Sequence, residues 1–326
     1  FSIYILNKHH SFAFGEFQWK VAVALTVGWV LTALGLIKGV KILGVISMVT
    51  ATLPYIIIAI LFGRGVSLDG ASEGIAWYLT APDFSKILEI QTWQNALMQL
   101  CFSLSVGLGG LLAMSSYNKR SHSCYRDTLI VLVADSSMSL VGGVAVFSTL
   151  GFLSKKLGKE IDQVVADPLS LAFVAYPEAI AQMPVPELWS FLFFVMLFLL
   201  GLSTMFGYVE CFVTCLNDSF PSLRTKKALA VCVTCAVCNV IGLVLFCFQN
   251  GILFFILFNE YLGSFALGLI IVVEVLVVTY FYGTYFFFRD IRCMLGGPSN
   301  TFFRFFGSSG WLLKLTTICT APLLAL

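Results

Sequence analysis

The chain has 326 residues, of which 59% are hydrophobic and only 11% are charged, and its formal net charge is +2. A soluble domain carries about 25% charged residues to cover its surface, so composition excludes a water-soluble globular protein. The small net charge and the lack of a dense lysine or arginine run give no support to a nucleic-acid partner.

Apolar stretches long enough to cross a bilayer recur along the whole chain. A transmembrane helix needs ~20 apolar residues to cross ~30 Å of hydrocarbon. Eight stretches meet this requirement, near residues 21–37, 42–63, 92–116, 128–153, 188–216, 228–248, 264–288 and 305–326. They predict an all-α, multi-pass protein of the cell membrane, with one transmembrane domain over residues 1–326.

The lysines and arginines predict the orientation of these spans. More than half of the 19 lie in four short loops, at residues 38–41, 117–127, 217–227 and 289–304. The positive-inside rule places these loops in the cytoplasm, and the longer loops 64–91 and 154–187 outside. The N-terminus then lies outside without a signal peptide before it. We therefore expect further spans before residue 1. The last apolar stretch also ends at Leu326 without a hydrophilic tail, so we expect the chain to continue on that side as well.

The third stretch differs from a plain membrane helix. Between Gln99 and Gly110 it holds three glycines and two serines, and a glycine costs ~1 kcal/mol relative to alanine in a helix interior. We expect the helix to break here, with its freed backbone groups facing a cavity for ions and substrate rather than lipid. The alternative is a glycine seam that lets two helices pack closely.

Polar residues at membrane depth are the second signal. A lone carboxylate at the bilayer centre costs at least ~2.5–3.5 kcal/mol, and Asp135 lies there with Ser139 on the same helical face. Gln99 and Ser103 repeat this spacing in the glycine-rich stretch, so two helices are predicted to face one ion site. Alternatively, Asp135 is a hydrogen-bonded structural acid. For Glu210, structural pairing explains an intramembrane acid at least as well as transport does.

Together, these residues resemble one family, the neurotransmitter:sodium symporters. The resemblance rests on the order and spacing of many short segments rather than on one motif. The matching segments include Thr50–Tyr55, Trp93–Gly110, Ser116–Lys119, Cys124–Asp127, Phe147–Gly151, Tyr176–Ile180, Gly201–Thr204 and Asp290–Gly296.

The resemblance implies an inverted-repeat symporter fold with discontinuous helices. The family has twelve helices, and this chain would run from the external loop before the fourth helix into the eleventh. The first three helices and the last would be missing, including the first helix, which supplies half of the family's ion and substrate ligands. The implied function is sodium-coupled symport of an amino acid or related small amine by alternating access, which is not enzymatic.

The resemblance also implies site residues, which carry over position by position. The substrate would contact Phe102, Ser103, Ser105, Leu108, Thr204, Met205 and Tyr208. Sodium ions would be bound by Ser103, Asp135, Leu200, Ser203 and Thr204. Chloride would be bound by Gln99, Ser103 and Ser139. The gates would use Asn259 and Glu260 outside and Asp218 inside.

Three of these positions depart from the family's usual pattern. Asp135 stands where most animal members have an asparagine shared by sodium and chloride, so its carboxylate could replace the chloride charge. We therefore expect sodium as the coupling ion and weak or absent chloride dependence. Tyr208 replaces a smaller residue, which suggests a restricted substrate. Asn259 stands at the acidic external gate position, with Glu260 beside it.

A different class of function stays open. The chain, without the family's first helix, could be a truncated or non-transporting homologue that regulates or assembles with a complete carrier. The other expected partners are the small-molecule substrate and the lipid bilayer, and homo-oligomerisation is left open. A membrane enzyme is disfavoured because no histidine, cysteine and aspartate lie at catalytic spacing.

Overall fold

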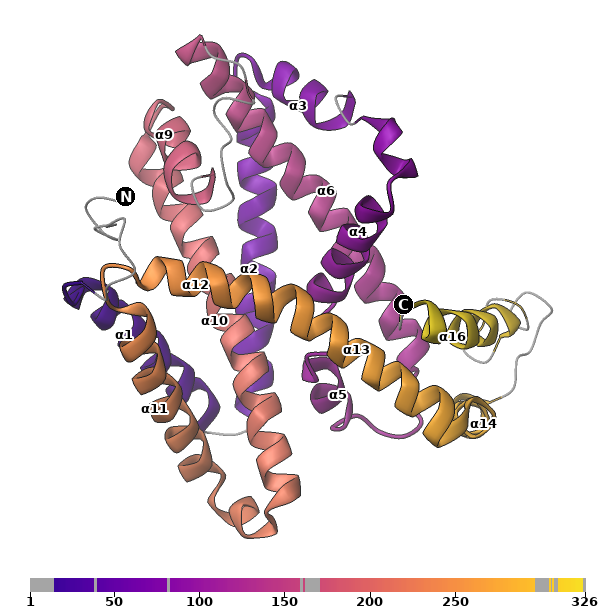
Figure 1. Cartoon of the computed structure of the whole chain (residues 1–326). Helices are drawn as coiled ribbons and strands as arrows, with labels where there is room; N and C mark the ends of the chain where they lie inside the picture. Colours follow the sequence, from indigo (N-terminus) through magenta and orange to yellow (C-terminus); the bar gives the residue numbers. More distant parts are fainter. Residues whose placement is uncertain are drawn as a thin grey trace. The chain divides into compact units, whose positions relative to one another are not determined.

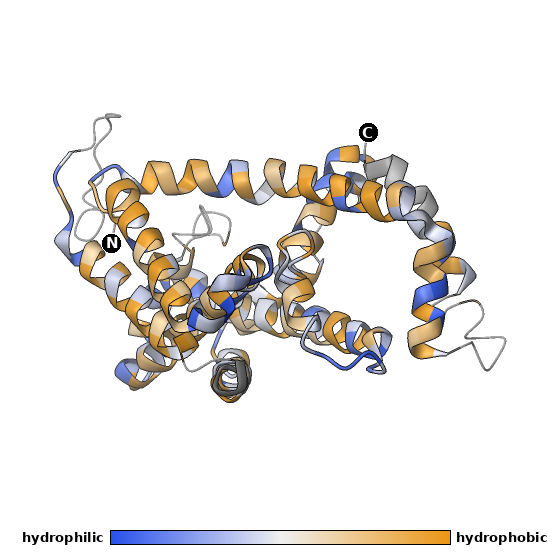
Figure 2. Cartoon of the chain, turned by 90° about the horizontal axis from the view of Figure 1, so that it is seen from below, coloured by the Kyte–Doolittle hydropathy of each residue, from blue (hydrophilic) through white to orange (hydrophobic). Residues whose placement is uncertain are grey.

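The structure is a computed structural model that describes residues 15–37, 40–80, 83–158, 161, 171–296, 305, 307 and 310–324. Within these ranges the chain is mostly helical, with short loops and turns between the helices and an isolated bridge between Phe17 and Phe248. Six helices within them are long and apolar enough to cross a membrane, and Figure 2 shows hydrophobic residues along most of their length. The predicted all-α membrane fold is confirmed. Parts of the predicted loops 38–41, 154–187 and 289–304 lie outside the described residues.

The chain forms two compact units, whose helices are labelled in Figure 1. Residues 1–89 and 136–255 make the first unit, and residues 90–135 and 256–326 make the second. The first contains α1 (Trp19–Ile37), α2 (Val40–Val66), α3 (Ala71–Thr80), η1 (Phe84–Leu88), η2 (Leu171–Ala175), α9 (Tyr176–Ala181), α10 (Pro186–Ser219), η3 (Pro221–Lys226), α11 (Lys227–Phe246) and the later part of α6 (Cys124–Leu157).

The second unit contains the elements around the glycine-rich stretch and the last part of the chain. They are α4 (Ile90–Ser103), α5 (Gly110–Ser115), the beginning of α6, the second half of α12 (Gly251–Glu260), η4 (Tyr261–Ala266), α13 (Leu267–Leu276), η5 (Val277–Gly283), α14 (Thr284–Leu295) and α16 (Trp311–Leu324). The glycine-rich span therefore consists of two short helices instead of one long helix.

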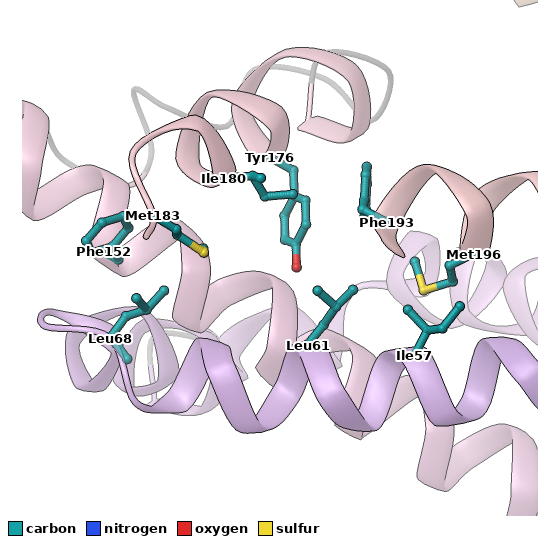
Figure 3. Close-up of a cluster of buried hydrophobic side chains, with 10 residues drawn as sticks. Ile57, Leu61, Leu68, Phe152, Tyr176, Ile180, Met183, Phe193 and Met196 are labelled. Carbon is teal, nitrogen blue, oxygen red and sulfur yellow. The ribbon is translucent and has the colours of Figure 1, made fainter. Parts of the chain in front are cut away.

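In the first unit, α2 packs along α10 and α1 packs along α11 (Figure 1). A buried cluster joins α2, α6, α9 and α10, and Figure 3 shows Tyr176 at its centre. The Tyr176 ring stacks on Phe193 with 4.4 Å between ring centroids. Since lipid is as apolar as these side chains, the cluster is stabilised by close packing more than by removal of apolar surface from water.

Glycines bring α3 and the connection before it against α6. A Cβ atom on Gly74 would lie 1.9 Å from the carbonyl oxygen of Phe147, and one on Gly151 would lie 2.5 Å from the carbonyl oxygen of Gly70. These distances leave no room for a side chain. Backbone therefore packs directly on backbone, as is typical of small-residue helix interfaces in membranes.

A buried ion pair links α10 to the start of α11. Glu210 is fully buried, and its Oε1 accepts a 2.5 Å hydrogen bond from Nζ of Lys227, whose side chain is 24% exposed. A buried carboxylate requires such a partner because desolvation of an isolated charge costs several kcal/mol. The pair favours the structural interpretation of Glu210.

We expect the substitution Lys227→Met to destabilise the protein by about 3 kcal/mol, the lower end of the range for a broken buried ion pair, since it leaves the Glu210 carboxylate without this cation. Thermal unfolding of the purified protein in detergent would show a lower midpoint. Lys226→Met, which changes an exposed neighbour, is the control and should leave the midpoint unchanged. Equal midpoints for Lys227→Met and the unsubstituted protein would contradict the assignment of this pair as structural.

The helices from α12 to α14 differ from the single span predicted near residues 264–288. Helical structure continues from Gly251 to Leu295, and η4 and η5 within it are π-helical. At Gly283 the φ angle is +89°, which a helix cannot accommodate, so the chain turns before α14. The predicted span at 305–326 corresponds to the shorter helix α16 in the described residues.

Candidate functional site

The break in the glycine-rich stretch lies between the end of α4 at Ser103 and the start of α5 at Gly110. Gly107 and Gly109 have φ angles of +77° and +73°, and Ser105 has +53°. This left-handed region favours glycine, which has no Cβ to clash with the backbone. The glycines predicted to interrupt the helix are therefore found at the interruption.

Close packing also contributes to the glycine requirement. A Cβ atom on Gly107 would lie 2.7 Å from Cγ1 of Ile271 and 3.2 Å from Cδ1 of Leu267, both on α13. Gly107 thus combines a positive φ with a tight contact to a neighbouring helix. The two interpretations of the glycine-rich stretch, as a broken helix and as a packing surface, both apply at this residue.

Ser103 and Asp135 come together next to the break. The Ser103 hydroxyl, at the end of α4, donates a 2.7 Å hydrogen bond to Oδ1 of Asp135 on α6. Asp135 is half-buried. A carboxylate, a hydroxyl and the backbone of an interrupted helix form a set of oxygen donors of the kind that bind hard cations. The arrangement therefore has the chemistry of a small-cation site, and the role of each residue stays a prediction.

A cavity of about 320 Å³ lies on the preceding turns of α4. Its lining brings together four residues predicted separately, Gln99, Phe102, Asn259 and Glu260. The predicted chloride ligand Gln99 and the predicted substrate contact Phe102 thus share one cavity with the predicted outer gate residues of α12. The remaining lining residues are Asn95, Met98 and Gly263.

Sequence reasoning missed Asn95 and Met98 as lining residues. A helical face repeats at three and four residues, so Asn95 and Met98 share the face of Gln99 and Phe102. That spacing was a sufficient signal to find both. Ser105 and Leu108, predicted to contact substrate, lie inside the break itself.

The other predicted sodium ligands, Leu200, Ser203 and Thr204, lie in the first unit, on α10. The carbonyl oxygen of Leu200 accepts hydrogen bonds from the Ser203 hydroxyl at 3.3 Å and from the Thr204 hydroxyl at 3.0 Å. Such back-bonding is the usual arrangement of a hydroxyl within a membrane helix. It also gathers at one position the three oxygens that were predicted as ligands, so the geometry fits both interpretations.

The other predicted residues of the first unit lie on α6 and α10. Met205 accepts a hydrogen bond at its sulfur from the Thr32 hydroxyl at 3.8 Å, and Tyr208 is 40% exposed. Ser139 lies four residues after Asp135 on α6, with its side chain exposed. These placements are compatible with the predicted roles and do not test them.

The predicted inner gate residue Asp218 has a partner within this chain. Oδ1 of Asp218 accepts a 3.1 Å hydrogen bond from Nη2 of Arg224, and both side chains are exposed. Sequence spacing could have indicated Arg224, which follows Asp218 by six residues across a turn. An exposed pair of this kind contributes at most ~1 kcal/mol to stability.

Comparison with known proteins agrees with the resemblance seen in the sequence. The model of the sodium:neurotransmitter symporter family matches residues 1–322. The chain belongs to this family. Members of the sodium:neurotransmitter symporter family are multi-pass plasma-membrane transporters and not enzymes.

Three relatives illustrate the similarity. The sodium-dependent transporter snf-5 of Caenorhabditis elegans is 45% identical over 313 residues, which cover 96% of this chain and 43% of the relative. The sodium- and chloride-dependent glycine transporter 2 of Xenopus laevis is 38% identical, covering 94% of this chain and 38% of the relative. The neutral and basic amino acid transporter B(0+) of Mus musculus is 38% identical, covering 86% and 44%. The chain spans less than half the length of these symporters.

Proposed function

We propose that this chain carries ion-binding and substrate-binding elements of a sodium-coupled symporter for an amino acid or related small amine. The observation that carries the proposal is the hydrogen bond between Ser103 and Asp135 beside the interrupted helix. A carboxylate in a membrane segment marks an ion pathway or site in most cases, because its insertion is costly.

In this mechanism, sodium binds between the Asp135 carboxylate, the Ser103 hydroxyl and carbonyl groups freed at the break. When sodium binds, it takes the position next to the Asp135 carboxylate that the Ser103 hydroxyl proton occupies in this structure. Since sodium binds only the conformation in which these oxygens converge, it shifts the population toward that conformation. Rocking of one helical bundle against the other would then open the site to the opposite side of the membrane.

Two observations support a small amino acid as the substrate. The cavity lined by Gln99, Phe102 and Glu260 has a volume of about 320 Å³, close to the lower end of the ~300–1,000 Å³ usual for ligand pockets. In addition, relatives are named for transport of glycine and of neutral and basic amino acids. The cavity also has polar groups beside an aromatic side chain, which suits the polar and apolar parts of such a substrate.

Chloride is expected to contribute less to transport than sodium does. A carboxylate at position 135 supplies a fixed negative charge beside the sodium, so a bound chloride is not required for charge balance. The relatives named sodium- and chloride-dependent include the two glycine transporters. We propose that transport by this protein needs sodium and depends weakly on chloride.

Uptake of radiolabelled glycine and a panel of neutral and basic amino acids tests this function. Cells would express either the chain itself or a form that carries any upstream sequence its gene encodes. We expect uptake in sodium medium that is lost in choline medium. Absence of sodium-dependent uptake in both forms, with normal surface expression, would contradict the proposal and favour a regulator of a complete carrier.

A serine variant connects the uptake to the site. Ser103→Ala removes the hydroxyl oxygen proposed as a sodium ligand, and since an interaction between a hydroxyl and a charged group is worth about 1.5–3 kcal/mol, sodium affinity should fall by at least ~10-fold. Ser115→Ala is the control, since the Ser115 hydroxyl bonds only to the Leu112 carbonyl of its own helix among the described contacts. The sodium concentration that gives half-maximal uptake measures the difference. Equal values for both variants would exclude Ser103 as a ligand.

A further inference from the structure

A second cavity in the second unit lies where α14 meets α16. Its volume is about 290 Å³, and its lining consists of Thr284, Tyr285, Phe288, Arg289, Arg292 and Lys314. We call this cavity the basic pocket. The loop that follows α14 is among those that the positive-inside rule places in the cytoplasm. The basic pocket is therefore expected at the cytoplasmic end of the helices.

Three cations converge on the basic pocket, and none of its lining residues is acidic. Nε of Arg289 lies 3.4 Å from Oδ1 of Asp290, and Asp290 also accepts a hydrogen bond from the Tyr282 hydroxyl. Within the described ranges, no ion pair joins Arg292 or Lys314 to a carboxylate. The basic pocket thus retains a positive charge that the chain itself neutralises only in part.

Aromatic rings hold the cations in place. The Lys314 ammonium lies over the Phe288 ring, 5.6 Å from its centroid, and the Arg289 guanidinium lies 4.9 Å from the centroid of Phe286. Phe288 is only 3% exposed, so it forms a fixed floor under the lysine. Such contacts orient flexible side chains and reduce the entropy that a ligand would otherwise have to remove.

The helix dipole and the positive-inside rule explain part of the positive charge at the basic pocket. Arg292 lies in the last turn of α14, where a cation interacts favourably with the helix dipole. They do not explain Lys314, which comes from a different helix. Like charges on long, flexible side chains separate into solvent unless an anion offsets their repulsion. Their convergence on one cavity indicates an anionic ligand.

We propose that the basic pocket binds a phosphomonoester group, as carried by inositol phosphates or by inositol lipids of the cytoplasmic leaflet. Guanidinium groups match the geometry of phosphate oxygens in pairs, and a lysine adds a point charge. Thr284 and Tyr285, which also line the cavity, carry hydroxyl groups of the kind that donate hydrogen bonds to phosphate oxygens. Basic pockets between membrane helices on the cytoplasmic side are a known type of site for such headgroups.

Binding to the purified protein in detergent micelles tests the proposal without reference to transport. The probe is dioctanoyl phosphatidylinositol bisphosphate, and native mass spectrometry counts the bound molecules. Dioctanoyl phosphatidylserine, which has no phosphomonoester, is the comparison lipid and should bind at least ~10-fold more weakly. Equal binding of the two lipids would overturn the proposal, since attraction to any anionic lipid would then explain it.

Charge variants locate the binding. Arg292→Gln and Lys314→Gln should each weaken the probe's affinity about fivefold, the effect expected for one cation near a phosphate. Lys314→Arg keeps the charge and should keep the affinity. Lys226→Gln removes an exposed cation of another cytoplasmic segment and should change the affinity less than twofold. Equal weakening by Lys226→Gln, or no change in either pocket variant, would overturn the proposal.

Soluble inositol trisphosphate distinguishes the source of the phosphate group. If it displaces the lipid at a similar concentration, the basic pocket recognises the phosphate group alone and a free metabolite can occupy it. If displacement needs at least ~10-fold more, the bilayer lipid is the ligand. Both outcomes support a phosphate site, whereas complete failure of the trisphosphate to compete would overturn it.

Discussion

Replacing Asp135 with asparagine is expected to make sodium-driven uptake depend on chloride. In the unsubstituted protein, exchange of chloride for gluconate should change uptake less than twofold, because the carboxylate supplies the negative charge next to sodium. In Asp135→Asn this negative charge is absent, so chloride must supply it. Exchange of chloride for gluconate should then reduce uptake at least ~10-fold, the effect expected when one charge a few ångströms from the sodium ion is lost. Initial uptake rates at fixed sodium measure both quantities.

Asp127→Asn is a matched control, since Asp127 lies at the start of the same helix and pairs with His122 instead of Ser103. It should behave as the unsubstituted protein in both media. Asp135→Ala should lose uptake in both media, because it removes the oxygen ligand as well as the charge. A collapse of the unsubstituted protein's uptake in gluconate would refute the role proposed for this carboxylate.

Gly107→Ala should abolish uptake and lower the thermal unfolding midpoint. A side chain at φ +77° costs about 1–2 kcal/mol, and its Cβ would also lie 2.7 Å from Ile271. Either the break or its contact with α13 must then shift, and the Ser103 hydroxyl at the end of α4 shifts with it. Uptake and thermal unfolding of the same preparation measure the two effects.

Gly110→Ala provides the comparison for this substitution. Gly110 is only three residues away, its φ is not in the left-handed region, and a Cβ there would meet no atom within 4 Å. Alanine also has the higher helix propensity at this first residue of α5. We therefore expect full uptake and an equal or higher unfolding midpoint. If both variants behaved alike, the backbone geometry at Gly107 would not be a requirement for function.

Features with a local cause could be predicted from the sequence. The helix break depends on glycines that adopt positive φ angles, which is a property of residue type. The pairing of Ser103 with Asp135 was predicted because polar groups in lipid must meet each other or water, whichever helices carry them. The membrane fold itself follows from composition, since too few charged residues exist to cover a soluble surface.

Features that depend on tertiary neighbours could not be predicted in the same way. From the sequence, Glu210 could be identified only as an acid within a membrane segment. Its partner Lys227 could be identified only from the structure, in which the start of α11 lies beside α10. The turn at Gly283 was missed because glycine is common in membrane helices and does not by itself indicate a positive φ. The π-helical segments could not be predicted from hydropathy, because hydropathy measures polarity and contains no information about the hydrogen-bond register of a helix.

The two π-helical segments have a consequence for how this part of the chain can vary. One extra residue in a helical turn rotates all following side chains by about 100° about the axis, relative to an unbroken α-helix. Substitution patterns on the two sides of η4 therefore follow different phases, and a homologue could lose one residue between 261 and 283 without unravelling the helix. An alignment that forbids gaps inside helices would then misplace every position after the lost residue.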